Sequence, residues 1–212
     1  MTDQELLEEV QYTLIEPPDG GQSWPSQLWT RNESLEYLNE RQDRFIRETH
    51  MIIVITNIDV VAPYGVRHPL PEDWMATVRI TWATVSTNVP KREVIRSDSW
   101  EADHGLLDWP TTSGQPKVYM DGDATPLTIQ LAPLPSEDGR LEVTYVPSCN
   151  PIDGNGTSLD VADEFAPTVK YGVLSDMFSK VGRANDPIRA KYCSDRFQMG
   201  VEIAQALLKG FK

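Results

Sequence analysis

The side chains that most often carry chemistry are few and scattered in this sequence. It contains two cysteines, Cys149 and Cys193, and three histidines, His50, His68 and His104. Zinc sites need such residues at short, fixed spacings, such as C-x-x-C or H-x-x-x-H, and neither spacing occurs. We therefore interpret the histidines as surface or structural residues. We expect the two thiols to be reduced rather than paired, because no secretory signal is evident.

Some acidic residues are arranged as in a calcium loop or an acid–base pair. Residues 153–160, DGNGTSLD, carry side-chain oxygens at alternating positions, but they lack the glycine and the distal glutamate that an EF-hand requires. Glu101 and Asp103 lie close in sequence, yet such pairs arise by chance among 32 acidic residues. We interpret residues 153–160 as a solvated turn and residues 121–123, DGD, as a hairpin turn.

The sequence contains no motif for nucleophilic catalysis or for nucleotide binding. No glycine-rich phosphate loop follows a strand-like segment, and no nucleophile can be matched with a base. We assign no catalytic, cofactor-binding or metal-binding residue. The sequence predicts a protein without enzymatic activity and without a cofactor.

The composition sets limits on what the elements can build. The chain has 212 residues, 40% of them apolar, which is enough for a sizeable core. The first residues, MTDQELLEEV, are acidic, and no run of about 18 apolar residues occurs, so we expect a soluble protein made in the cytoplasm, without a membrane span. The net charge of −13 disfavours tight wrapping of nucleic acid. It favours solubility, and it would also suit a passage that DNA crosses without sticking.

Two helices are predicted near the N-terminus. Thr2 with Glu5, and Thr30 with Glu33, form capping-box patterns, in which each side chain bonds to the backbone of the other residue. Apolar residues then recur at helical spacing. The first helix should end by about residue 16, because PPDGG follows, and the second should continue to about residue 50.

A change of period near residue 51 marks the start of strand-like sequence. MIIVITNIDVV is β-branched and almost continuous, and ATVRITW alternates between small or polar and large apolar residues. Turn sequences such as TSGQP, DGDATP and LPSEDG separate further candidates. This pattern indicates an antiparallel sheet or a small sandwich, with residues 97–103 as a helical turn or an exposed loop. The expected strands cover residues 51–61, 76–82, 92–96, 117–120, 127–131 and 141–146.

The last part of the chain returns to a helical pattern. Apolar residues recur at helical spacing over residues 165–181, ending with Val181, and again over residues 188–211, beginning with Ile188 and Tyr192, and we expect both lines to be apolar inner faces. Asp186 followed by Pro187 is typical of an N-cap and the first position of a helix. The sequence therefore predicts a helical hairpin at the C-terminus.

The predicted order of elements is helix, helix, sheet, helix, helix. Each helical pair carries an apolar face that needs a partner, and a single bundle of both pairs would cover both faces. The predicted fold is therefore α+β, with a helical bundle of residues 1–50 and 163–212 and an inserted antiparallel β module of residues 51–162. Separate packing of each pair on the sheet is the alternative.

Three stretches resemble the head-to-tail adaptor proteins of tailed bacteriophages, which are also called connector or head-completion proteins. The stretches are residues 35–45, LEYLNERQDRF, residues 139–147, GRLEVTYVP, and residues 171–197, which include the turn before Asp186. The resemblance is one of pattern rather than of a signature motif. It covers the helical ends and the last expected strand, and the middle module takes no part in it.

The resemblance implies a structural virion protein of the phage neck. Such a protein would form a homo-oligomeric ring, a dodecamer, beneath the portal protein, would extend the DNA channel and would offer a platform to tail or nozzle proteins. Genomic DNA would pass through the lumen without sequence-specific binding, because acidic walls would repel it.

The end of the last predicted helix is a candidate docking surface for the portal. Leu208 and Phe211 extend the apolar pattern to a chain end that usually frays unless something holds it. We expect Leu207, Leu208, Phe211 and Lys212 to form part of that surface. Capping of the protein's own core by these residues is the alternative.

Two other classes of function stay open on the sequence. A β-sandwich binding module, for carbohydrate for example, on a phage tail or another soluble assembly, could use Trp100 and Trp109 as stacking platforms if they are exposed. An enzyme of unknown class is the other, and the missing catalytic residues count against it.

Overall fold

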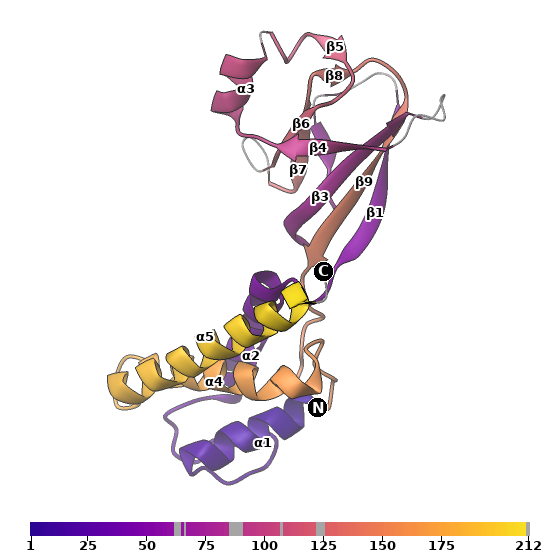
Figure 1. The fold of residues 1–212 in the computed structure, drawn as a ribbon. Helices are drawn as coiled ribbons and strands as arrows, with labels where there is room; N and C mark the ends of the chain where they lie inside the picture. Colours follow the sequence, from indigo (N-terminus) through magenta and orange to yellow (C-terminus); the bar gives the residue numbers. More distant parts are fainter. Residues whose placement is uncertain (62–64, 66, 85–90, 107, 122–125, 211–212) are drawn as a thin grey trace. The chain divides into compact units, whose positions relative to one another are not determined.

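The computed structural model describes residues 1–61, 65, 67–84, 91–106, 108–121 and 126–210. Its contacts divide the chain into two compact units. The helical unit comprises Met1–Met51 and Ser148–Lys212, and the sheet unit comprises Ile52–Pro147 (Figure 1). Most of the helices belong to the first unit, and a largely antiparallel sheet forms the second, so the fold is α+β, as predicted.

The helices of the helical unit begin where the sequence predicts. Both capping boxes are present, at Thr2 with Glu5 and at Thr30 with Glu33. Asp186 accepts a hydrogen bond of 3.0 Å from the backbone N–H three residues later and so caps the last helix. The elements of this unit are α1 (Asp3–Leu14), α2 (Arg31–Thr49), the short 3-10 helix η1 (Asp163–Phe165), α4 (Ala166–Ser179) and α5 (Pro187–Gly210).

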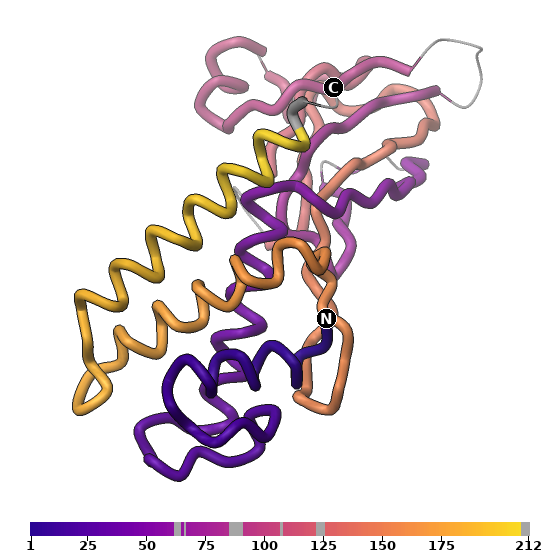
Figure 2. The backbone as a smooth tube through the Cα atoms, turned by 60° about the horizontal axis from the view of Figure 1, so that its bottom comes forward, coloured from indigo at the N-terminus to yellow at the C-terminus, as the bar shows by residue number. Residues whose placement is uncertain are grey.

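Helix α4 is the centre of the helical unit, because α1, α2 and α5 all pack against it (Figure 2). Val173 and Leu174 are fully buried, as the predicted apolar face requires. Val181, which the sequence pattern placed on the same face, is exposed because α4 ends at Ser179. The buried residues of α4 are Ala166, Thr168, Val169, Gly172, Val173, Leu174, Ser175, Met177 and Phe178.

The buried face of α5 differs from the predicted one in its first turns. The pattern placed Ile188 and Tyr192 on the apolar inner face, and this prediction was wrong, because both side chains are exposed. Tyr192 and Phe197 are five residues apart, which is about 140° around a helix, so the first two residues of the pattern lie away from the buried side. The small side chains of Ala190 and Cys193 take the inner positions, and the stripe continues through Phe197, Gly200, Val201 and Ala204.

Residues 148–162 belong to the helical unit, whereas the sequence pattern grouped them with the β module. Side chains of α1 and α2 hold this loop by bonds to its backbone. The buried Asp3 carboxylate accepts from the N–H groups of Gly154 and Gly156 at 2.8 and 2.9 Å. Asn39 of α2 both donates to and accepts from one residue of the loop. Such tertiary bonds leave no periodic signal in the sequence, which is why the loop could not be assigned to the helices.

The sheet unit is built on a seven-stranded sheet of order β1-β9-β3-β4-β6-β7-β2. Neighbouring strands are antiparallel except β4 and β6, which are parallel because the chain crosses between them through α3 (Ser99–Gly105). All six predicted strand segments are present with small shifts, and three very short strands were not predicted. The strands are β1 (Val54–Val60), β2 (Arg67–Pro69), β3 (Trp74–Thr84), β4 (Arg92–Arg96), β5 (Ser113–Gly114), β6 (Val118–Asp121), β7 (Thr128–Ala132), β8 (Leu134–Pro135) and β9 (Gly139–Pro147).

The main apolar core of the sheet unit is made by side chains from six of these strands and by Leu70. Trp82 lies in this core, and Gly139 faces it, because a Cβ at position 139 would lie 2.1 Å from the Trp82 ring. A smaller cluster includes Ala102 of α3. The main core consists of Val60, Leu70, Ile80, Trp82, Val94, Tyr119, Ile129, Leu131, Leu141, Val143 and Tyr145.

Candidate functional site

The predicted docking residues lie at the C-terminal end of α5. Leu207 is exposed and Leu208 is half-buried. Phe211 and Lys212 lie outside the described residues. The docking role of these four residues therefore stays a prediction.

A line of exposed side chains runs along α5, and we call it the α5 face: Ile188, Tyr192, Arg196, Met199 and Ile203. Steps of four, four, three and four residues keep these side chains on one side of an α-helix. Ile188 is 82% exposed, and the other three apolar members are each 51% exposed. The Arg196 Nε donates to the Tyr192 hydroxyl at 3.1 Å, and among the described residues no carboxylate pairs with it.

A second exposed line, which we call the α1 face, consists of Glu5, Glu8, Tyr12 and Ile15. Tyr12 is 80% exposed, and Ile15, which ends the helix in the left-handed conformation at φ 62°, is 92% exposed. Glu8 forms no ion pair within the described part of the chain. A groove of ≈ 1030 Å³ lies beside this face, lined in part by Glu5, Glu8, Tyr12 and Lys170.

Close packing between α4 and α5 gives the α5 face a firm support. A Cβ at Gly172 would lie 2.9 Å from the Phe197 ring, and a Cβ at Gly200 would lie 2.2 Å from the Thr168 hydroxyl. Any larger side chain at either position would push the two helices apart. The α5 face therefore stands on a helix that is held closely against the centre of the unit.

Two ion pairs join α2 to the other side of α4. The Arg41 guanidinium makes two hydrogen bonds to the Asp176 carboxylate, and this contact raises the pKa of Arg41. Lys180 approaches Glu33 to 2.7 Å, and its hydrogen bond lowers the pKa of the Glu33 carboxyl. Both pairs connect segments far apart in the sequence, so they position the helices relative to one another.

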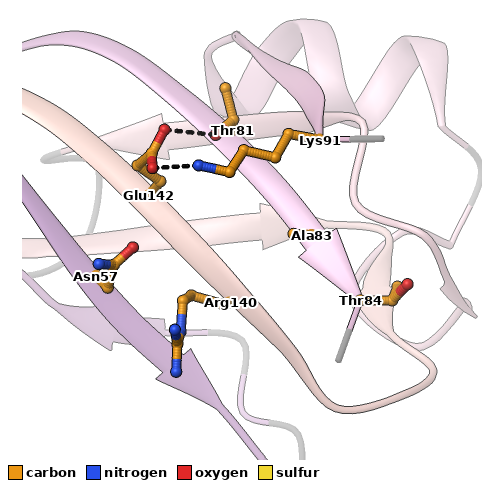
Figure 3. A pocket seen from close by; sticks show the side chains of 7 residues that line it. All are labelled: Asn57, Thr81, Ala83, Thr84, Lys91, Arg140 and Glu142. Carbon is orange, nitrogen blue, oxygen red and sulfur yellow. Dashed lines mark hydrogen bonds and ion pairs between the residues drawn. The ribbon is translucent and has the colours of Figure 1, made fainter. Parts of the chain in front are cut away.

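A polar hollow of ≈ 370 Å³ lies over β1, β9 and β3 of the sheet unit (Figure 3). Glu142 accepts hydrogen bonds from the Lys91 ammonium and, at 3.5 Å, from the Thr81 hydroxyl; the Lys91 contact lowers the pKa of Glu142. Arg140 pairs with Asp59 at 2.7 Å. The charged groups of the hollow neutralise one another, and the described residues that line the hollow include no histidine or cysteine. The hollow can offer hydrogen bonds to a ligand, but it has no matched nucleophile and base.

The two tryptophans of the carbohydrate-binding hypothesis lie in different environments. Trp100 is 68% exposed and stacks on His104 with ring centroids 4.3 Å apart. Trp109 is only 8% exposed, and its indole N–H donates to Asp103 at 2.7 Å. Trp109 therefore cannot serve as a stacking platform, and the expected pair of platforms is reduced to Trp100.

The histidines do not gather at one place. His50 ends α2 in the helical unit, while His68 and His104 belong to the sheet unit. His68 is buried, its Nε2 has no partner in the described structure, and burial lowers its pKa below the ordinary value of 6.5. His68 is therefore neutral at physiological pH and is a structural residue of the sheet unit.

Both thiols are free and are poor nucleophiles at neutral pH. Burial raises the pKa of Cys193, and burial together with a hydrogen bond to Asp43 raises the pKa of Cys149 strongly. Because the thiolate is the reactive form, a raised pKa lowers reactivity.

The acidic patterns singled out in the sequence are occupied by local hydrogen bonds. Asp153 accepts from the backbone and side chain of Asn155 and from the Thr157 hydroxyl, as a turn does. Glu101 accepts from a serine hydroxyl, whereas Asp103 accepts from an indole, so these two carboxylates have different partners. Most of the predicted turn 121–123 lies outside the described residues.

Neither a metal-binding cluster nor a membrane-spanning helix is found among the described residues. No group of three or more His, Cys, Asp or Glu side chains is arranged to hold a metal ion there. None of the helices in that part of the chain is both long and apolar enough to span a bilayer.

The structure thus defines an α+β protein with two exposed, partly apolar helix faces on its helical unit. A comparison with family models agrees with a role in assembly: the model described as SU10 adaptor protein matches residues 1–208. The chain belongs to the SU10 adaptor protein family, and it is a structural adaptor protein of a bacteriophage virion. A search of the curated proteins found no match.

Proposed function

We propose that this adaptor is a protein of the virion neck that forms a ring between the portal and the tail and extends the DNA channel. The family match over residues 1–208 is the observation that carries this proposal. The ring is homo-oligomeric and dodecameric, its one end docks on the portal protein, and its other end receives tail or nozzle proteins. A ring is a specific form of the adaptor role, because a ring at the portal is the simplest way for one chain to join two symmetric structures.

The charge of the chain supports the channel part of the proposal. With 32 acidic and 19 basic residues, each copy carries a net charge of −13. A ring of such copies surrounds its lumen with negative potential, which repels the phosphate backbone of DNA. The genome then passes through the ring without sequence-specific binding.

Mixing the purified protein with the portal protein of the same phage tests the proposal. We expect a complex that sediments faster than the portal alone and that shows, in electron micrographs, an added ring coaxial with the portal. The portal protein of an unrelated phage is the control and should gain no ring. Failure to bind an assembled cognate portal would contradict the proposal.

The C-terminal residues Leu207, Leu208, Phe211 and Lys212 are proposed as part of the portal-docking surface. The exposure of Leu207 on the last helix supports this assignment. Deletion of residues 207–212 should weaken portal binding at least about tenfold, because an apolar anchor is lost, while the thermal melt stays unchanged. A lowered melting temperature with portal binding retained would instead show that these residues cap the protein's own core.

A carbohydrate-binding role is not proposed as a second function. It depended on two exposed tryptophans, and Trp109 is buried.

A further inference from the structure

We propose that neighbouring copies of this chain contact one another head to tail through the helical unit, with the α5 face of one copy seated on the α1 face of the next. This inference rests on the proposed ring, and it adds which residues build the contact between copies. The occupant of each face is therefore a second copy of the same chain.

The two helices carry complementary charge. Helix α1 contains four acidic residues and no basic one, whereas α5 contains four basic and two acidic residues. The positions of the α5 face hold Arg196 and no acid, although the chain as a whole is strongly acidic. Within the described residues neither Glu8 nor Arg196 has an ion-pair partner, so each is available to the other across an interface.

Both faces also expose apolar side chains that nothing within the described chain covers. The α5 face presents Ile188, Met199 and Ile203, and the α1 face presents Tyr12 and Ile15 beside its groove. A ridge of apolar side chains with one central arginine on α5 matches a groove with acidic walls on α1. Burial of these side chains between copies removes apolar surface from water, which is the main favourable contribution to association.

The position of the two faces explains why the contact produces a ring rather than a closed dimer. Helix α4 lies between α1 and α5 in both views of the helical unit (Figures 1 and 2). Because the two faces are different surfaces of one body, their contact is heterologous, so each copy leaves one face free for a further copy. The series ends only when the rotation between copies closes the ring.

The contact between two isolated copies is weak on this account. The α5 face is about 22 Å long and the α1 face about 15 Å, at about 1.5 Å per helical residue, so the pair buries less than the roughly 800 Å² per partner of a standard stable interface. Like net charges also repel at low salt. Copies therefore gather mainly on the portal, which supplies the remaining contact area.

Two variants that each retain one intact face test the contact. The double variant Met199→Glu, Ile203→Glu disrupts the α5 face only, and the double variant Glu8→Lys, Tyr12→Lys disrupts the α1 face only. All four positions are exposed or lie on the outer side of a helix, so the fold should be retained, and circular dichroism melts check this. Controls with the same change of net charge are Ser194→Glu, Gln198→Glu for the first variant and Glu36→Lys, Gln198→Lys for the second, all at exposed positions off both faces.

The measurement is sedimentation velocity in about 0.15 M salt, where the Debye length is about 8 Å, at protein concentrations up to about 1 mM. We expect the wild type and both controls to form a concentration-dependent series of oligomers. Each face variant alone should stay monomeric, and their equimolar mixture should form a one-to-one dimer and nothing larger.

Several results would overturn the inference. The wild type could stay monomeric throughout this range of concentrations. A face variant could associate like the wild type. The mixture of the two face variants could stay monomeric while the wild type associates. Each would show that these faces do not bind each other and that the portal, the tail or another surface of the chain occupies them.

Electron microscopy of the same variants with the portal separates this inference from the proposed function. Face variants that still add a closed ring to the portal would contradict the α1–α5 contact and leave the neck role intact. A wild type that self-associates as expected but does not bind the portal would contradict the neck role and leave the contact between copies intact.

Discussion

The helical unit and the sheet unit hold distant parts of the chain together in different ways. In the helical unit, buried or half-buried polar side chains form these links, as Asp3 does with the loop 148–162 and Arg41 with Asp176. In the sheet unit, backbone ladders and an apolar core do so, while ion pairs such as Arg79 with Glu93 are exposed. From this difference we expect the contribution of a polar side chain to stability to depend on its burial and not on its charge.

The largest effect is expected in the centre of the helical unit. Leu174→Asp on α4 should unfold this unit, because burial of an unpaired carboxylate costs several kcal/mol. Circular dichroism during urea unfolding measures the change. Val181→Asp, at a side chain 94% exposed just beyond the same helix, is the control and should unfold like the wild type. A Leu174→Asp protein as stable as the wild type would refute the packing of α1, α2 and α5 around α4.

The next effect concerns the buried polar links of the helical unit. Asp3→Ala removes the acceptor of two backbone N–H groups of the loop 148–162, and it should lower the free energy of unfolding by about 1–3 kcal/mol. Asp163→Ala, which breaks an exposed pair with the N-terminus, should lower the free energy of unfolding much less in the same urea experiment. Equal losses in the two variants would remove the distinction between buried and exposed polar groups.

A difference in pH dependence between the units follows from two shifted pKa values. The pKa of His68 in the folded protein is lowered from 6.5 by burial. Below about pH 6.5 the unfolded chain therefore binds more protons than the folded one, and the sheet unit loses stability as the pH falls. The pKa of Glu33 is lowered from 4.5 by its hydrogen bond to Lys180. The stability that this bond gives the helical unit therefore persists until the pH falls below about 4.5.

Hydrogen exchange of amides in each unit, followed from pH 7.5 to pH 5 and corrected for the intrinsic rate, tests this difference. We expect protection to fall in the sheet unit and to stay constant in the helical unit. His68→Gln should abolish the pH dependence of the sheet unit. An unchanged pH dependence in that variant would show that another group causes it.

The smallest effect is expected at the polar hollow of the sheet unit. Lys91→Met breaks the exposed pair with Glu142 and should change the free energy of unfolding much less than Asp3→Ala does. Urea unfolding in 1 M salt, where screening already weakens the pair, should reduce the difference further. A loss of several kcal/mol would mean that the hollow is a structural centre of the sheet unit and that exposed ion pairs do stabilise it.

Local signals explain how much of the fold could be predicted from the sequence. The capping boxes at Thr2 and Thr30 and the Asp186-Pro187 pair act within a few residues, and the helices begin where they indicate. The strand β4 matches its predicted residues 92–96. The strands β2, β5 and β8 escaped prediction because two or three residues have no measurable period and are held only by their partners.

The candidate site was less predictable, because it depends on which side of a helix is covered. Ile188 and Tyr192 read as core residues by periodicity, and only the packing of α5 on α4 shows that Ala190 and Cys193 take that place. One signal was available in the sequence. Arg196 lies at helical spacing within an otherwise apolar line of an acidic chain. A charged residue in such a line indicates that the line faces the surface and not the core.

The central claim is that the helical unit, and not the sheet unit, joins the copies of the adaptor. The sheet unit offers a competing surface, because β1 is an edge strand with Val54 and Ile55 exposed, and such edges pair readily with other strands. A cryo-electron microscopy reconstruction of the adaptor bound to its portal would show which unit joins the copies. The account predicts a ring in which α1 of each copy contacts α5 of the next. Copies joined through the β1 edges, with both helix faces open to solvent, would contradict it.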